Sequence, residues 1–210
     1  MKTYNYDYTD KVLKQLKRKI AKRFSEYKSL VGFDELNLLQ RATDMFDGLE
    51  SDAEEAYLNI AKHYARELDQ EKIITKKWLN GYFTSYNPIT TYQYKHEVDR
   101  KKYRMFEAYM ATKALMEIDK CMKLWTLQVT QASDDITDLA IIDSAKETGY
   151  KWVMWMTEED DKVCSECAPR DRKIYPINKI PDKPHYHCRC TIIPLTEEDK
   201  KILETESVED

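Results

Sequence analysis

The chain has 210 residues, of which 34% are charged and 11% aromatic, with four glycines and six prolines. This composition is typical of a folded, helix-rich protein of one or two small domains, and it excludes a disordered chain. The formal net charge of −4 argues against a general nucleic-acid coat. No segment approaches the ~20 consecutive apolar residues of a membrane-spanning helix, so we expect no membrane among the partners.

Apolar residues spaced by three and four positions predict a first helix that Thr9 or Asp10 begins and that Val31-Gly32 ends. Basic residues are concentrated between Lys11 and Lys28. We favour a solvated face of an amphipathic helix over a phosphate-binding face as their interpretation. The predicted buried positions of this helix are Leu13, Leu16, Ile20, Phe24 and Tyr27.

A second, long helix is predicted after Asp34, which is suited to cap it. Its three-four spacing is typical of a helix packed against another in coiled-coil fashion, and Gly48 marks a potential kink. Its apolar positions are Leu39, Ala42, Phe46, Leu49, Ala53, Ala56 and Ile60. A shorter helix is expected from Gln70 to Leu79, and Asn80-Gly81 and Asn87-Pro88 predict a loop after it.

The helical pattern returns over residues 94–131 and predicts another long helix. Ser133 is suited to cap a further helix that runs through Ala145. Gly149 is expected to end that helix in the left-handed conformation that glycine adopts readily. The methionines and aromatic residues of these segments are interpreted as core residues rather than as a cofactor site.

After Gly149 the pattern changes to that of short strands. Residues 151–156 (Lys-Trp-Val-Met-Trp-Met) are rich in strand-forming side chains, and residues 158–161 are expected to form a turn. Lys173-Ile-Tyr175 and Thr191-Ile-Ile193 are further candidate strands, separated by a loop that contains three prolines. The end of the chain therefore predicts a small β-rich module.

Four of the five cysteines lie within this module. A Cys-x-x-Cys pair on a tight turn, facing a second Cys/His group across a loop, is a typical way to bind one zinc ion tetrahedrally. Two ligand sets remain open, because His185 is able to replace either Cys188 or Cys190. The candidate metal ligands are Cys164, Cys167, His185, Cys188 and Cys190.

Disulfide bonds, or reduced thiols without a metal, are the alternatives to a zinc site. With Cys121 left over as an odd thiol, the cysteine count favours a reducing compartment and metal binding. A site with four protein ligands leaves no open position for water, so we expect a structural zinc ion rather than a catalytic one. Its role would be to stabilise a module too small for a sufficient core.

These patterns together predict an α+β fold. We expect an elongated helical N-terminal body over residues 1–132, a small β-rich, zinc-knuckle-like module over residues 133–196, and an acidic tail over residues 197–210. The chain contains no Gly-rich phosphate loop and no His-Glu-x-x-His motif. We therefore expect neither an enzyme nor a protein with a small-molecule substrate.

The order of the C-terminal motifs resembles a known family. Residues 149–157 (Gly-Tyr-Lys-Trp-Val-Met-Trp-Met-Thr), 161–167 (Asp-Lys-Val-Cys-Ser-Glu-Cys), 173–175 (Lys-Ile-Tyr) and 184–190 (Pro-His-Tyr-His-Cys-Arg-Cys) resemble the C-terminal domain of the phage minor head proteins, the Mu F-like head morphogenesis proteins. The resemblance covers roughly residues 134–195. The residues on the family's motif positions are Asp161, Cys164, Cys167, His185, Cys188, Arg189 and Cys190.

The resemblance implies a minor capsid protein with a structural role in head morphogenesis. Such a protein is made in the host cytoplasm, is incorporated into the virion, and associates with the portal protein or the major capsid protein, with a further role in DNA packaging or ejection. The chain departs from the family by carrying Arg170-Asp171-Arg172 where members often have a glycine, and by lacking an Arg-Thr-Glu-like triplet in the preceding helix.

An alternative function is a zinc-knuckle protein that binds nucleic acid and contacts packaged DNA. The basic residues of the knuckle would then face the phosphates, and the basic first helix would add to the same surface. The net negative charge, and the lack of an obvious reading helix after the cysteines, argue against this alternative. The basic residues concerned are Arg170, Arg172, Lys173 and Arg189.

Overall fold

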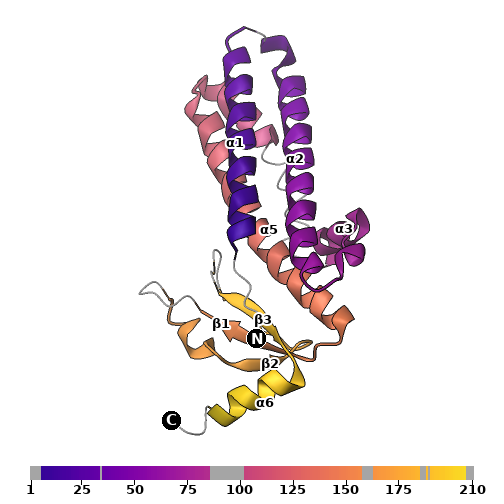
Figure 1. The fold of residues 1–210 in the computed structure, drawn as a ribbon. Helices are drawn as coiled ribbons and strands as arrows, with labels where there is room; N and C mark the ends of the chain where they lie inside the picture. Colours follow the sequence, from indigo (N-terminus) through magenta and orange to yellow (C-terminus); the bar gives the residue numbers. More distant parts are fainter. Residues whose placement is uncertain are drawn as a thin grey trace. The chain divides into compact units, whose positions relative to one another are not determined.

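The computed structural model describes residues 6–33, 35–85, 102–157, 163–184, 188 and 190–206. The fold is α+β, with long helices followed by a small antiparallel sheet and a last helix (Figure 1). The chain divides into two compact units. The sheet unit contains Met1–Tyr8, Ala61–Ile74 and Asp134–Asp210, and the helical unit contains Thr9–Ile60 and Thr75–Ser133. No helix in the described ranges is long and apolar enough to cross a membrane.

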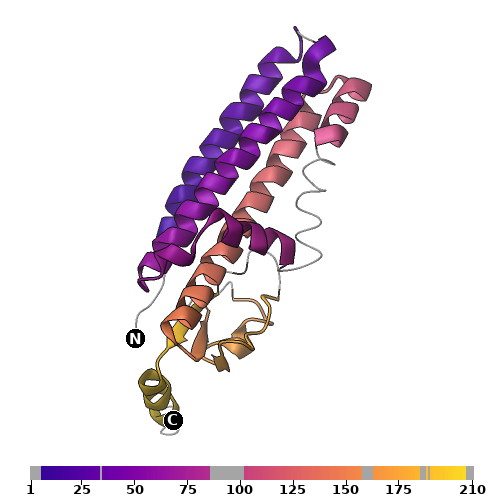
Figure 2. The same cartoon turned by 90° about the vertical axis from the view of Figure 1, so that its right-hand side faces the viewer.

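The helical unit is built on α1 (Asp7–Leu30), α2 (Leu38–Arg66) and the first half of α5 (Met116–Thr148). These helices run side by side in both views (Figures 1 and 2). All five predicted core positions of the first helix are buried, because the three-four spacing places them on one face. The rings of Phe24, Phe46 and Trp125 then meet edge to face across the three helices, at centroid distances of 6.3 and 5.6 Å.

Ion pairs join the same helices at their partly exposed edges. Lys19 Nζ lies 3.0 Å from Asp52 Oδ1, and Arg23 Nε lies 2.6 Å from Asp52 Oδ2, so two cations of α1 share one carboxylate of α2. Lys28 Nζ lies 2.8 Å from Asp119 Oδ1 on α5. The hydrogen bonds from Arg23 and Lys19 outweigh the opposing effect of burial and lower the pKa of Asp52.

α2 runs unbroken through Gly48, so the glycine does not end the helix. A Cβ atom at Gly48 would lie 2.2 Å from Arg23 Nη1 and 2.6 Å from Arg23 Cζ. The missing side chain therefore makes room for the guanidinium that reaches Asp52. The α2 register also differs by one residue at its start, where Leu38 is fully buried and the predicted core residue Leu39 is 37% exposed.

The helix predicted from Gln70 to Leu79 is wrong in its bounds. The structure has a single 3₁₀ turn, η2 (Glu71–Ile73), and then α3 (Lys76–Ser85). Thr75 separates them, because its Oγ1 accepts the backbone N–H of Trp78 at 3.1 Å, which is N-cap geometry. The loop predicted at Asn80-Gly81 is wrong, because both residues lie inside α3. The predicted cap at Asp34 and the predicted loop at Asn87-Pro88 lie outside the described residues.

The long helix predicted over residues 94–131 is also wrong, because the chain breaks within it. Residues 102–112 are helical, Lys113 has a φ of +54°, and α5 starts at Met116. α5 then continues through Ser133, which is buried and does not cap a helix. The Ser133 hydroxyl instead donates to the Val129 carbonyl one turn earlier, at 2.7 Å, and this bond satisfies it inside the helix.

The predicted end of this helix at Gly149 is confirmed. Gly149 has a φ of +95°. Its N–H donates to the Lys146 carbonyl at 3.0 Å, and the Tyr150 N–H donates to the Ala145 carbonyl at 2.9 Å. These two hydrogen bonds form the glycine-dependent C-cap that ends the helix before the first strand.

The three predicted strands are confirmed with shifted ends. β1 (Trp152–Met156) lies between β2 (Ile174–Pro176) and β3 (Thr191–Leu195), and both pairings are antiparallel. Alternation along β1 turns Val153 and Trp155 toward one buried cluster, which contains the cysteines, and Met154 toward another. The sheet therefore positions the candidate site on one of its faces.

The acidic segment after residue 196 contains a helix, α6 (Glu197–Glu206), rather than only a tail. Thr196 and Asp199 cap it reciprocally: Asp199 N–H donates to Thr196 Oγ1 at 3.0 Å, and Thr196 N–H donates to Asp199 Oδ2 at 3.1 Å. Lys200 Nζ lies 4.7 Å from the Trp152 ring centroid, and Leu203 packs against the cluster that contains Met154. This helix thus covers part of the second face of the sheet.

Candidate metal centre

The first cysteine pair lies on a compact turn that its own backbone closes. The Cys167 N–H lies 3.1 Å from the Cys164 carbonyl oxygen and 3.2 Å from Cys164 Sγ. The Ala168 N–H also donates to the Cys164 carbonyl, at 3.0 Å. A 3₁₀ turn, η3 (Ala168–Arg170), follows at once, with a proline in its first turn, where no backbone donor is lost. The turn thereby directs Cys167 inward, and Cys167 is only 2% exposed.

The second cysteine pair leads into β3. Cys190 is the residue before Thr191, the first residue of that strand, and Cys188 lies two positions earlier. Both side chains are buried in one cluster with Val153 and Trp155 of β1, and Cys167 reaches the same cluster from its turn.

Three sulfur atoms converge at this point. The Sγ atoms of Cys167, Cys188 and Cys190 all lie within 4.8 Å of one another, and those of Cys167 and Cys188 are 3.5 Å apart. A tetrahedral ion with metal–sulfur bonds of about 2.3 Å requires sulfur–sulfur distances of about 3.8 Å. The buried cysteine cluster therefore has the donor atoms and the spacing to hold a metal ion.

The electrostatics of the cluster favour one shared negative charge. The hydrogen bond from Cys190, with further contributions from Cys167 and the charge of Lys183, lowers the pKa of Cys188 to about 5 against the cost of burial. Burial and hydrogen bonds with Cys164 and Cys188 raise the pKa of Cys167 to about 12. The hydrogen bond to Cys188 and burial raise the pKa of Cys190 as well. A cation bound among these sulfurs would be needed to ionise all three.

A buried donor beside the sulfurs fits the same interpretation. Trp155 is 1% exposed and belongs to the cysteine cluster. A hydrogen bond from its side chain favours the ionised form of Cys190 and partly offsets the causes that raise the pKa of that thiol. A metal-bound thiolate is a strong acceptor, so an indole donor at this position suits a thiolate more than a neutral thiol. The guanidinium of Arg170 lies on the ring, 5.1 Å from its centroid.

The other predicted ligands have different positions. Cys164 is half-buried and packs against the cluster, but it is not part of the group of mutually close sulfurs. His185 lies outside the described residues, as do Asp161 and Arg189 of the family motif. The odd thiol, Cys121, is buried in the helical unit. Both Cys164 and His185 therefore remain open as the fourth ligand.

The structure also places a polar network at the cysteines that the sequence analysis missed. Tyr6, Asp138 and Lys183 contact one another and the carbonyls of the second cysteine pair. Burial, and then the charge of Asp138, raise the pKa of Tyr6 well above its usual value. The attraction of Asp138 outweighs the effect of burial and raises the pKa of Lys183. The sequence contained one signal for this network: Asp138 lies among the apolar positions of its helix, where a buried charge requires a partner.

The chain matches no protein-family model, no curated protein and no solved structure.

Proposed function

We propose that this protein is a minor head protein of a tailed phage, with a structural role in head morphogenesis, and that a zinc ion bound by its cysteines closes the sheet unit. The convergence of Cys167, Cys188 and Cys190 within 4.8 Å is the observation that carries the proposal. It supports a metal-binding use of the same cysteine positions on which the resemblance to the minor head family rests.

Zinc is the ion that this donor set fits best. Soft thiolates in tetrahedral arrangement select zinc over the hard cations that prefer oxygen ligands. The ion would be held by Cys167, Cys188 and Cys190 with Cys164 or His185 as the fourth ligand, so it would have no open position for a reaction. Its contribution would be to the folding of a three-stranded sheet whose core is small. We accordingly propose a structural protein rather than an enzyme.

An exposed apolar surface on the helical unit supports a protein partner. Phe33 is 91% exposed and Leu36 is 100% exposed in the connection between α1 and α2. Large apolar side chains exposed three positions apart in one connection are candidates for an interaction site. The Lys113–Glu35 ion pair, with 2.8 Å between Nζ and Oε1, joins this connection to residues 110–116, which contain further exposed apolar side chains. The exposed apolar residues of both stretches are Leu30, Phe33, Leu36, Leu39, Met110, Leu115 and Met116.

The portal protein or the major capsid protein is the partner that the proposed role implies, with assembly in the host cytoplasm and a final location in the virion. The test is co-expression of the chain with each of the two proteins encoded by the same phage, followed by affinity capture. We expect Phe33→Ser with Leu36→Ser to abolish capture and Leu124→Ser with Leu127→Ser to leave it intact. The control pair is comparably exposed, at 50% and 52%, and lies on α5. Capture of neither protein by the wild-type chain would refute the proposed role.

The proposed zinc site has a separate test. Protein purified without chelator and under reducing conditions should contain one zinc ion per chain by elemental mass spectrometry. Cys190→Ser should remove it and Cys121→Ser should not. A metal-free wild-type protein with intact thiols would refute the zinc site without bearing on the partner.

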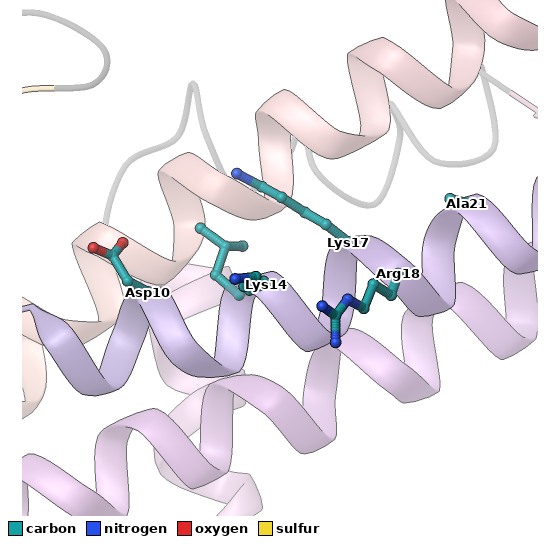
Figure 3. Close-up of a pocket in the computed structure, with 6 residues that line it drawn as sticks. Asp10, Lys14, Lys17, Arg18 and Ala21 are labelled. Atoms are coloured by element: carbon teal, nitrogen blue, oxygen red, sulfur yellow. The ribbon is translucent and has the colours of Figure 1, made fainter.

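A second candidate function is binding to packaged DNA, and one feature of α1 favours it. A shallow groove of about 490 Å³ on this helix is lined by Asp10, Leu13, Lys14, Lys17, Arg18 and Ala21 (Figure 3). Lys14, Lys17 and Arg18 have no ion-pair partner within the described ranges, whereas Lys19, Arg23 and Lys28 of the same helix are paired. Arg170 of the knuckle is occupied, since its Nη1 donates to the Asp182 carbonyl at 2.7 Å.

Duplex DNA binding should then depend on salt and on these three cations. Charge reversal at Lys14, Lys17 and Arg18 is compared with reversal at Lys77, Lys123 and Lys201, which are exposed and scattered along the chain. Loss of binding in the first triple variant alone would support this function, because neutralised phosphates set the salt dependence. Equal weakening in both would indicate only a general charge effect.

A further inference from the structure

A buried polar network joins three distant parts of the sequence at the cysteine cluster. Lys183 Nζ lies 2.5 Å from Asp138 Oδ2 on α5 and 3.2 Å from the hydroxyl of Tyr6, which precedes α1. The Tyr6 hydroxyl donates to the other carboxylate oxygen of Asp138. The side chains of Lys183 and Asp138 are only 13% and 11% exposed. All three residues belong to the sheet unit.

The same network reaches the backbone of the second cysteine pair. Lys183 Nζ lies 3.4 Å from the Cys188 carbonyl oxygen, and the Tyr6 hydroxyl lies 3.5 Å from the Cys190 carbonyl oxygen. The third donor of the ammonium group is thus used on a candidate ligand residue. Both carboxylate oxygens of Asp138 are also occupied, and the single proton of the Tyr6 hydroxyl is used on Asp138, so the network is closed on itself and anchored on the backbone of Cys188.

Fold stability alone gives a weak reason for such a network. Removing an ammonium and a carboxylate from water costs several kcal/mol per ion, and well-packed apolar side chains of the same size often stabilise a fold as well or better. Apolar side chains, however, are unable to hold a carbonyl oxygen in place. They also supply no positive charge next to sulfurs that carry negative charge when a metal is bound.

From this arrangement we propose that Lys183, held by Asp138 and Tyr6, is a positioning residue of the metal centre that fixes the backbone of Cys188 for metal binding. The N-terminal segment thereby becomes part of the metal site through Tyr6. This inference rests on the proposed zinc site. It adds that the affinity of the site depends on three residues that do not touch the ion.

The decisive variant replaces the ion pair by apolar side chains, Asp138→Leu with Lys183→Met. The fold is expected to keep its stability without metal, because both buried charges are removed together. Zinc affinity, measured by competition with a chromogenic chelator, is expected to fall 10- to 100-fold, as is typical when partners of metal ligands are lost. Tyr6→Phe keeps the ring under the ammonium and removes only the hydroxyl, so a smaller loss in the same direction is expected.

Two controls separate positioning from general destabilisation. Lys183→Arg retains the charge and the donors and should recover most of the affinity that Lys183→Met loses. Asp52→Asn breaks a comparable ion pair in the helical unit and should leave zinc affinity unchanged. The absorption spectrum of the cobalt-substituted protein should shift in the Asp138→Leu/Lys183→Met variant, because the geometry of the thiolates changes.

The outcomes are distinct. A wild-type chain that binds no zinc overturns the proposed zinc site and this inference with it. A wild-type chain that binds one zinc ion, together with a double variant of equal affinity and unchanged cobalt spectrum, overturns the inference alone. A double variant that loses stability without metal while keeping its zinc affinity assigns the network a purely structural role and equally overturns it.

Discussion

Replacement of Cys167 by serine tests the proposed centre most directly. Cys167 is 2% exposed and its sulfur lies 3.5 Å from that of Cys188, so Cys167→Ser places a hydroxyl among sulfurs and apolar side chains. Without metal, burying that hydroxyl is expected to cost about 1–3 kcal/mol of unfolding free energy. With zinc at 1,000 times its dissociation constant, the wild-type protein should gain about 4.1 kcal/mol that the variant lacks.

The matched control for Cys167→Ser is Cys121→Ser. Cys121 is 6% exposed in the helical unit, so the same chemical change is made at a similarly buried site away from the cluster. Unfolding of the two units is followed separately by hydrogen exchange of β1 and of α1, each with zinc and with chelator. The zinc-dependent gain should appear in β1 of the wild-type and Cys121→Ser proteins only.

The reasoning fails if Cys167→Ser retains the full zinc-dependent gain, because a thiolate of the central cluster would then be dispensable. It fails equally if no zinc-dependent gain is found in the wild-type protein under reducing conditions. A loss in Cys167→Ser that is the same with zinc and with chelator would show that the cysteines contribute only packing.

Three further predictions concern the scaffold. Gly48→Ala should gain up to ~1 kcal/mol of helix propensity, but it should also displace the Arg23 guanidinium, which would lie 2.2 Å from the new Cβ. Its effect on the unfolding free energy should therefore be more favourable by ~1 kcal/mol in an Arg23→Ala background than in the wild-type background. Equal effects in both backgrounds would contradict the close approach. Burial lowers the pKa of His63, whose ring stacks on that of Tyr8 at a centroid distance of 3.8 Å. The unfolded state therefore binds the proton more readily, and stability should fall as the pH decreases from 6.5 toward the folded-state pKa. Subtracting the pH profile of His63→Gln should isolate that slope, and superimposable profiles would disprove it. Thr196→Ala removes the hydroxyl that caps α6 and should cost ~1 kcal/mol, seen as faster amide exchange in α6 with β1 unaffected; unchanged exchange would show that packing alone fixes the helix.

Local signals predicted much of the scaffold. The burial of Leu13, Leu16, Ile20, Phe24 and Tyr27 followed from their spacing, and the left-handed φ of Gly149 followed from the end of the apolar pattern. Strand-forming residues around Val153 and Trp155 predicted β1. In each case the deciding interactions lie within a few residues of chain, so the sequence contains them directly.

The errors arose where a residue had two local solutions. Ser133 is an equally good N-cap and helix-interior residue, because its hydroxyl is able to bond either to a free N–H or to the carbonyl one turn earlier. Thr75 resolves the same choice in the opposite way and caps α3. Packing around the whole helix decides between the N-cap and the helix-interior role, and the spacing of apolar residues within one segment does not reveal which role is taken.

By itself, the sequence determined an α+β fold, the three strands and a set of cysteines with metal-ligand spacing. Tertiary structure decided which sulfurs converge, with Cys167 meeting Cys188 across 21 positions. It also decided that the Tyr6 hydroxyl donates a hydrogen bond to the carboxylate of Asp138, 132 positions away. The physical reason is that burial makes a charge or a donor dependent on partners from other segments, and only the folded chain brings those partners within hydrogen-bonding distance.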